Sequence, residues 1–371
     1  MPLSTSYSES VFSRLQDVGE TLWQQKAYSE AHTTFEIVVR ERARLLGRCN
    51  PQSLISASWL GRSLLSLAQY EEAASVLYST MQDQPRISFA GELGWVERRY
   101  GDATEIIRSS KTDQVDPWWA KRLDTAYTTL WLAQCLHHQG KRTEATSYAR
   151  QTYPIFNRNL GDSHKDTIIS LRFRGSAEGQ VRLYALAEIS LRRSLYLGSK
   201  FLAPTDEDFI RIRINYGIVL YGIKCYGRAL DHLHFGHDHQ VATRGKTHMD
   251  IIDTLSCIGS AQYELSLPEK SAKSWRQVLE ARQLSLGAQH LKTQIAMQSL
   301  AFALAMGGIW GEAVSLLELV LRAREETLGP EHPKTMESRR TVQKGRKMMM
   351  GGKWMLWSFW PKRRELDCRH L

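Results

Sequence analysis

Small, aromatic and large apolar residues recur along this chain in a fixed order, separated by polar residues. Each copy has two small residues, with a mostly aromatic position between them and a mostly large apolar position four residues after the second. The first small residues are Gly19, Gly61, Gly91, Ala133, Gly175, Gly217, Gly259 and Ala301, and the second are Ala31, Ala73, Ala103, Ala145, Ala187, Ala229, Ser271 and Ala313. The aromatic position holds Tyr28, Tyr70, Tyr100, Tyr184, Tyr226 and Trp310, and the large apolar one holds Phe35, Leu77, Ile107, Leu191, Leu233, Trp275 and Leu317. The same arrangement therefore occurs eight times.

This spacing predicts two antiparallel helices in each copy, a first helix and a second helix. A glycine inside a helix costs about 1 kcal/mol relative to alanine, so its recurrence requires a packing reason. We expect the small residues to let the two helices approach closely, with the aromatic residue filling the space beside the turn. Segments such as Gln139-Gly140 and Gly307-Gly308 would form the turns between helices.

A second recurring segment links one copy to the next. The connectors are Leu160-Gly161 with His164, Gly245 with His248, Leu286-Gly287 with His290, and Leu328-Gly329 with His332. They repeat every 42 residues, except that Ala203 replaces the glycine in one copy. Such a fixed period is typical of a helical repeat array. We expect the glycine to end the second helix as a left-handed residue. Asp or Thr downstream, as in Asp166 and Thr335, would cap the next first helix, and the histidines would fix the connector turns.

These offsets resemble the tetratricopeptide repeat (TPR), and the Leu-Gly-x-x-His-x-x-Thr connectors resemble the kinesin light chain type of TPR. The resemblance covers about residues 11–349 and implies an all-α, right-handed TPR solenoid with a 42-residue period. We accordingly expect a disordered N-terminus at 1–10, eight repeats over 11–334, a capping helix at 335–349 and a basic aromatic tail at 350–371. A solenoid needs a polar terminal helix to cover its last apolar face.

Two copies depart from the pattern. Only 30 residues separate Gly61 from Gly91, so the second helix between them should be short. Arg174 and Glu178 stand where the other copies have apolar residues, and these groups require either partners or solvent.

The net charge of +10 lies almost entirely at one end of the chain, because residues 339–371 hold ten basic side chains against two acidic ones. The repeats are therefore nearly neutral, and the charge says little about their partners. Five scattered cysteines favour a reducing compartment over a disulfide framework. There is no signal-peptide pattern and no run long enough to span a membrane. These features predict a cytoplasmic protein.

The resemblance implies that a peptide or protein partner binds the concave face, which is built from the first helices. Asparagines commonly hold the peptide backbone there in the kinesin light chain type, and in this chain only Asn215 keeps that residue. The expected groove residues are Gln134, His138, Arg172, Gln180, Arg211, Asn215, Tyr221, Tyr263 and Gln298. The expected function is a non-catalytic scaffold or adaptor for protein–protein interaction.

Catalytic and cofactor motifs are missing from the sequence: there is no phosphate-binding loop, no dinucleotide fingerprint and no nucleophile elbow. The segment from His232 to His239 is dense in histidine, and His234 and His237 have the spacing of ligands on one helix face. No adjacent general base accompanies them. We therefore expect no enzyme activity, no cofactor and no metal, and a metal-dependent role remains as an alternative that rests on this segment alone.

The C-terminal tail contains Trp354, Trp357, Phe359, Trp360, Lys362, Arg363 and Arg364. Indoles settle at the headgroup level of a bilayer and cations meet anionic lipid, so this tail fits a membrane or partner hook. It fits equally a strap that covers the end of the solenoid. The alternative function is therefore a regulatory protein recruited to an anionic membrane through the tail. Nucleic-acid binding is not expected, since the segment is short and has no fold of its own.

Overall fold

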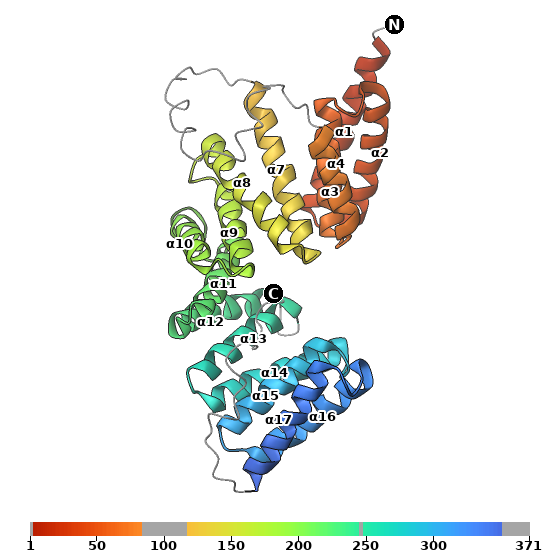
Figure 1. Ribbon diagram of the computed structural model, residues 1–371. Coiled ribbons are helices and arrows are strands. Elements are labelled where there is room, and N and C mark those ends of the chain that lie inside the picture. Colours follow the sequence, from red (N-terminus) through yellow and green to blue (C-terminus); the bar gives the residue numbers. More distant parts are fainter. Residues whose placement is uncertain (1–2, 84–116, 245–247, 351–371) are drawn as a thin grey trace. The chain divides into compact units, whose positions relative to one another are not determined.

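The computed structural model describes residues 3–83, 117–244 and 248–350. All fifteen elements in these ranges are α-helices, and none is a strand. The chain divides into two compact units, Met1–Ala177 and Glu178–Leu371, and the boundary lies within α9 (Lys165–Gln180). In each unit consecutive helices pack against each other as hairpins, which is the arrangement of a TPR solenoid (Figure 1).

The first unit contains three described helix pairs and the first turns of α9. The pairs are α1 (Leu3–Gln24) with α2 (Tyr28–Leu46), α3 (Pro51–Ser66) with α4 (Tyr70–Asp83), and α7 (Pro117–His138) with α8 (Arg142–Leu160). The first helices α1, α3 and α7 also contact one another in that order. Their side chains therefore share one face of the unit.

The second unit continues the same alternation. It contains α10 (Tyr184–Phe201), α11 (Glu207–Gly222), α12 (Tyr226–Arg244), α13 (Met249–Glu264), α14 (Pro268–Leu286), α15 (Leu291–Met306), α16 (Trp310–Leu328) and α17 (Pro333–Met349). The first helices α11, α13 and α15 contact each other in order. The helix starts of this unit recur at an even spacing, and in each copy that the structure describes the aromatic position is the first residue of a second helix.

The recurring glycines lie where two helices touch. A Cβ atom built on Gly61 would lie 2.5 Å from Leu77 Cγ, and one on Gly217 would lie 2.8 Å from Leu233 Cγ. Both leucines belong to the large apolar position of the same copy, so the predicted close approach is confirmed. The aromatic position packs on the next copy: a Cβ on Gly222 would lie 2.4 Å from the Tyr184 ring.

The turn between the two helices of a pair has a residue with positive φ. These residues are Lys26, Ala68, Gly140, Arg182, Lys224, Ser266 and Gly308, with φ from 58° to 80°. Most of them carry side chains, which raises the cost of this left-handed conformation by roughly 1 kcal/mol each. The packing of the hairpin must therefore hold the turn in place.

The connectors use a glycine and a histidine, as predicted, but the cap is different. Gly287 ends α14 with φ 81° and ψ 164°, a combination that is essentially restricted to glycine. The next helix is capped by the histidine itself, because Nδ1 of His290 accepts from the backbone N–H of Lys292 at 3.1 Å. The expectation that Asp166 or Thr335 would cap the next first helix is therefore wrong. The backbone N–H of Asp166 donates to the ring of His164, and Thr335 is buried.

The cap position is shared by all the connectors that are described. His164, His248, His290 and His332 fill it with a ring nitrogen, while Asn50 and Asp206 fill it with a side-chain oxygen. Each accepts from the N–H two residues further on, which satisfies one of the free donors at a helix start. The recurrent histidines are therefore explained as helix caps.

The first and last described helices form the ends of the array. Helix α1 begins at Leu3, within the segment 1–10. The final helix α17 begins at Pro333 and buries Thr335, Ser338, Val342 and Gly345. Most of the third expected copy lies in 84–116, outside the described residues. No described helix is long and apolar enough to span a bilayer.

Candidate partner-binding site

Three tryptophans surround one arginine on the first-helix face of the first unit. The guanidinium carbon of Arg62 lies 3.8 Å from the ring centroid of Trp23, 4.7 Å from that of Trp59 and 4.9 Å from that of Trp131. The rings touch in sequence, with centroids 5.9 Å apart for Trp23 and Trp59 and 6.0 Å apart for Trp59 and Trp131. We call these four residues the Arg62 cluster. Trp59 and Trp131 occupy the register position of Asn215.

The electrostatics of the Arg62 cluster are those of a partly desolvated cation. Burial lowers the pKa of Arg62, while the charge of Asp166 acts in the opposite direction. Within the described ranges we find no carboxylate in ion-pairing contact with its guanidinium. The Asp166 carboxylate instead accepts a hydrogen bond from the Tyr127 hydroxyl. Each cation–π contact contributes roughly 0.5–2 kcal/mol, so the rings hold the arginine in place while its N–H groups keep capacity for an acceptor.

Two of the expected groove residues lie on α7, after Trp131 in the sequence. Gln134 is half-buried, and the His138 ring stacks on Tyr70 with centroids 4.4 Å apart and planes 7° apart. Burial also lowers the pKa of His138. One face of this histidine ring is therefore covered by Tyr70. Arg172, on α9, is half-buried.

The expected groove residues of the second unit divide into engaged and available side chains. Gln298 accepts a hydrogen bond from Arg324 at 2.8 Å, and Arg211 pairs with Glu207 at 2.8 Å. Asn215 lies one helical turn after Arg211 on α11 and is half-buried. The structure thus puts Arg211 and Asn215 on one helix face.

The remaining three expected groove residues lie near the ends of first helices. Tyr221 on α11 has its ring 5.4 Å from that of Tyr226, and burial raises the pKa of Tyr263 on α13. Gln180, at the end of α9, is half-buried. These three side chains are therefore partly buried between helices.

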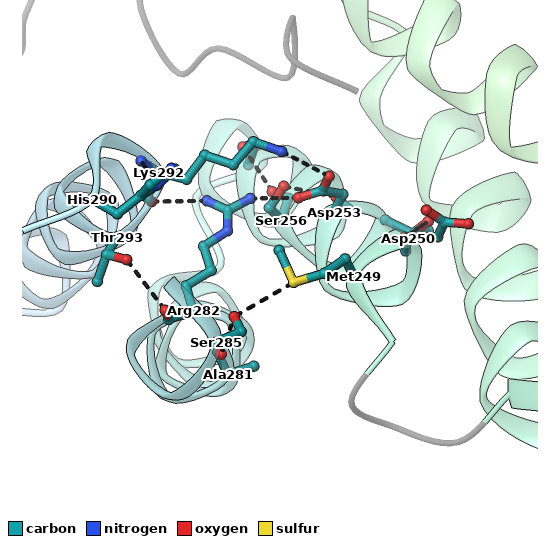
Figure 2. Close-up of polar contacts among 12 residues, drawn as sticks. Met249, Asp250, Asp253, Ser256, Ala281, Arg282, Ser285, His290, Lys292 and Thr293 are labelled. Atoms are coloured by element: carbon teal, nitrogen blue, oxygen red, sulfur yellow. Dashed lines mark hydrogen bonds and ion pairs between the residues drawn. The ribbon is translucent and has the colours of Figure 1, made fainter. Parts of the chain in front are cut away.

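A buried ion cluster joins three helices of the second unit (Figure 2). Arg282 of α14 donates to Asp253 Oδ1 at 2.8 Å, and Lys292 of α15 donates to Asp253 Oδ2 at 3.2 Å. Arg282 also donates to the backbone carbonyl of Lys292 at 3.1 Å. The side chains of Arg282 and Asp253 are only 6% and 12% exposed. Because Arg282 lies at the end of one copy and Lys292 at the start of the next, the cluster joins the two copies.

The same register position holds a buried arginine in two other copies. Arg42 donates to Ser56 Oγ at 2.8 Å, and Arg324 donates to Ser338 Oγ at 2.6 Å. Sequence reasoning missed these arginines, although each stands five residues before a connector glycine. That constant offset is the feature that would have revealed them.

The histidine-rich segment of α12 has several separate roles. The rings of Phe235 and His239 stack with their centroids 4.2 Å apart, and the guanidinium carbon of Arg213 lies 3.7 Å from the centroid of the Phe235 ring. Burial, then the charges of Arg213 and Arg228, lowers the pKa of His232 to about 4. In the part of the chain that the structure covers, no three His, Cys, Asp or Glu side chains gather as a metal site would require. The tail residues Trp354 to Arg364 lie outside the described residues.

Comparison with known proteins gives one family match. Residues 293–334 match the tetratricopeptide repeat model. This segment runs from the start of α15 to the start of α17, so it covers one hairpin and its connector. No curated protein sequence matches the chain.

Solved structures share the fold at low sequence identity. A Rap protein complexed with Competence and Sporulation Factor is 10% identical, with a TM-score of 0.57 and coverage of 94% of this chain and 91% of that one. The APC/C hetero-tetramer Cut9–Hcn1 is 13% identical, with a TM-score of 0.54 and coverage of 89% and 48%. Nearly identical TPR-like repeats described as those of a kinesin light chain from Podosopora anserina are 18% identical, with a TM-score of 0.46 and coverage of 54% and 95%. Residues 293–334 therefore match a tetratricopeptide repeat, and the paired helices of the described residues share that fold.

Proposed function

We propose that this protein is a non-catalytic scaffold or adaptor that binds a peptide or protein partner on the face formed by its first helices. The observation that carries the proposal is the Arg62 cluster, in which three indoles hold a partly desolvated guanidinium on that face. Tryptophan and arginine are the residue types that most often dominate binding energy at protein interfaces. A fold that serves mainly to display side chains suits this role.

The chemistry of the cluster indicates what it would contact. An arginine stacked on aromatic rings keeps its in-plane N–H donors for a planar acceptor such as a carboxylate or a peptide carbonyl. In the second unit, Arg211 and Asn215 lie on one face of a first helix, and we propose the expected groove residues of each unit as the binding surface of that unit. A Rap protein and the Cut9–Hcn1 tetramer, which share the fold, were both solved as complexes. The cytoplasm is the compartment we propose.

Partner purification with quantitative mass spectrometry tests the proposal. We would compare the wild type with Arg62→Gln and with Asn215→Ala, using Arg276→Gln as a control that removes one exposed arginine from a second helix. The binding variants should lose a common set of partners, while the control retains them. Melting temperatures establish that each variant is folded. An identical set of partners for all four proteins would refute binding on this face.

The alternative function, recruitment to an anionic membrane through the tail, rests on the sequence alone. Replacing Trp354, Trp357 and Trp360 with serine should abolish co-sedimentation with phosphatidylserine vesicles if the tail is a hook. Unchanged co-sedimentation together with a lower melting temperature would favour the strap.

A further inference from the structure

The outer face of α10 is unusually apolar for a second helix of this array. Leu186, Ile189 and Tyr196 are 42%, 55% and 49% exposed. They lie along one stripe of the helix together with Arg193 and Lys200, because their spacing follows the three- and four-residue steps of a helix face. No other described helix carries as many exposed large apolar side chains.

The repeat register shows that the fold itself does not require this stripe. The positions equivalent to Leu186, Ile189 and Tyr196 are polar in every later second helix. They are Arg228, Asp231 and Asp238 in α12, Lys270, Lys273 and Glu280 in α14, and Glu312, Ser315 and Arg322 in α16. Three helices with the same role thus expose polar groups where α10 exposes apolar ones.

The charges on the stripe all have one sign. Arg193 and Lys200 lie beside the Tyr196 ring, with the Lys200 Nζ atom 4.5 Å and the Arg193 guanidinium carbon 5.8 Å from its centroid. Arg192 lies at the edge of the stripe. The carboxylate of this helix, Glu188, is half-buried, accepts from the Tyr216 hydroxyl and pairs with Arg192. The stripe is therefore apolar and cationic, and it lacks an exposed acidic group.

We propose that the outer face of α10 is a docking surface for an acidic amphipathic helix of a partner protein. Apolar residues of such a helix would cover Leu186, Ile189 and Tyr196, and its flanking carboxylates would meet Arg193 and Lys200. A stripe one helix wide fits a single helix laid along it.

Other occupants fit less well. A second copy of the chain would bring two cationic stripes together, and the chain's own tail is also basic. A flat anionic bilayer covers more than one helix, and α12, the second helix of the next copy, exposes Asp231 and Asp238. Charge complementarity therefore selects an acidic helix.

Fluorescence anisotropy with the full chain tests this. The probe is a labelled helical peptide with leucines on one face and glutamates flanking them, and its counterpart has lysines in place of the glutamates. We expect the acidic peptide to bind, with binding that weakens as salt rises. Leu186→Ser with Ile189→Ser, and separately Arg193→Glu with Lys200→Glu, should each weaken binding by about tenfold or more. Lys270→Ser with Lys273→Ser on α14 is the matched control and should leave binding unchanged.

Several results would overturn the proposal. These are no binding of the acidic peptide, equal binding of the lysine peptide, or binding that neither double variant of α10 weakens. Phosphatidylserine vesicle binding lost in the Leu186→Ser, Ile189→Ser variant would identify a membrane surface instead, and a dimer lost in that variant would identify a second copy. Because this surface is separate from the Arg62 cluster, Arg62→Gln should bind the acidic peptide normally, so the two proposals fail independently.

Discussion

Gly217 on α11 provides a direct test of the close helix approach. A Cβ atom at this position would lie 2.8 Å from Leu233 Cγ and 3.1 Å from the backbone carbonyl oxygen of Ala229. The leucine can shift, but the backbone carbonyl is fixed within α12. Overpacking of this kind costs about 1–3 kcal/mol, and the better helix propensity of alanine returns about 1 kcal/mol. Gly217→Ala should therefore destabilise the protein by roughly 1 kcal/mol and by no more than about 2 kcal/mol.

Gly227 is the matched control, because it lies in the same hairpin and has no atom within 4 Å of an added Cβ. Gly227→Ala should be neutral or stabilising by up to about 1 kcal/mol. The free energy of unfolding would be measured by urea denaturation followed by far-UV circular dichroism. In a Leu233→Ala background, which removes much of the steric conflict, Gly217→Ala should become less costly. If Gly217→Ala is as stable as Gly227→Ala, close approach does not explain the recurring glycines.

Three further predictions concern other parts of the fold. Asp253→Asn should lower the free energy of unfolding by about 3–5 kcal/mol, because it leaves Arg282 without its buried counter-ion. Glu312→Gln, in an exposed ion pair, should lower it by less than about 1 kcal/mol, and equal losses would contradict a stabilising role of the buried ion cluster. His290→Ala should lower the melting temperature through a cap loss of about 1 kcal/mol while His290→Asn restores it, and failure of asparagine to rescue would show that the ring matters for another reason. The pKa of His232 is about 4 in the folded chain, against an ordinary value of 6.5, so the unfolded state binds the proton first and the folded state loses stability as the pH falls from 6.5 towards 4. His232→Gln should therefore reduce the fall in melting temperature between pH 6.5 and pH 4, and an unchanged pH profile of the melting temperature would refute this assignment.

The paired helices were predictable because small residues and glycines carry specific information. Gly61 and Gly217 mark contacts at which a larger residue would have to displace its neighbour, and the connector glycines mark a backbone conformation that other residues rarely adopt. Glu178 was expected to need a partner, and it is buried and accepts a hydrogen bond from Ser190 at 2.9 Å. These features depend on local geometry, which repeats with the sequence.

The contacts between copies were harder to predict. Arg282 reads as an exposed charge in a polar helix, and only the positions of Asp253 and the Lys292 carbonyl in neighbouring helices show that it is buried. The Arg62 cluster likewise combines rings from three first helices that are distant in sequence. Register alone could place Trp59 and Trp131 on one face, but it could not show that a cation would lie among them.

The buried arginines have a consequence for how the array unfolds. Arg42, Arg282 and Arg324 couple one copy to the next through hydrogen bonds from a charged group, whereas the equivalent position is Gly198 at the end of α10, and Gln240 at the end of α12 accepts a neutral hydrogen bond from Thr254 at 3.1 Å. In a linear array, cooperativity depends on the strength of each nearest-neighbour interface. We therefore expect local opening to begin at the interfaces that follow α10 and α12, while the copies from α13 onwards open together. Hydrogen exchange would then show a protected C-terminal block and earlier opening on its N-terminal side.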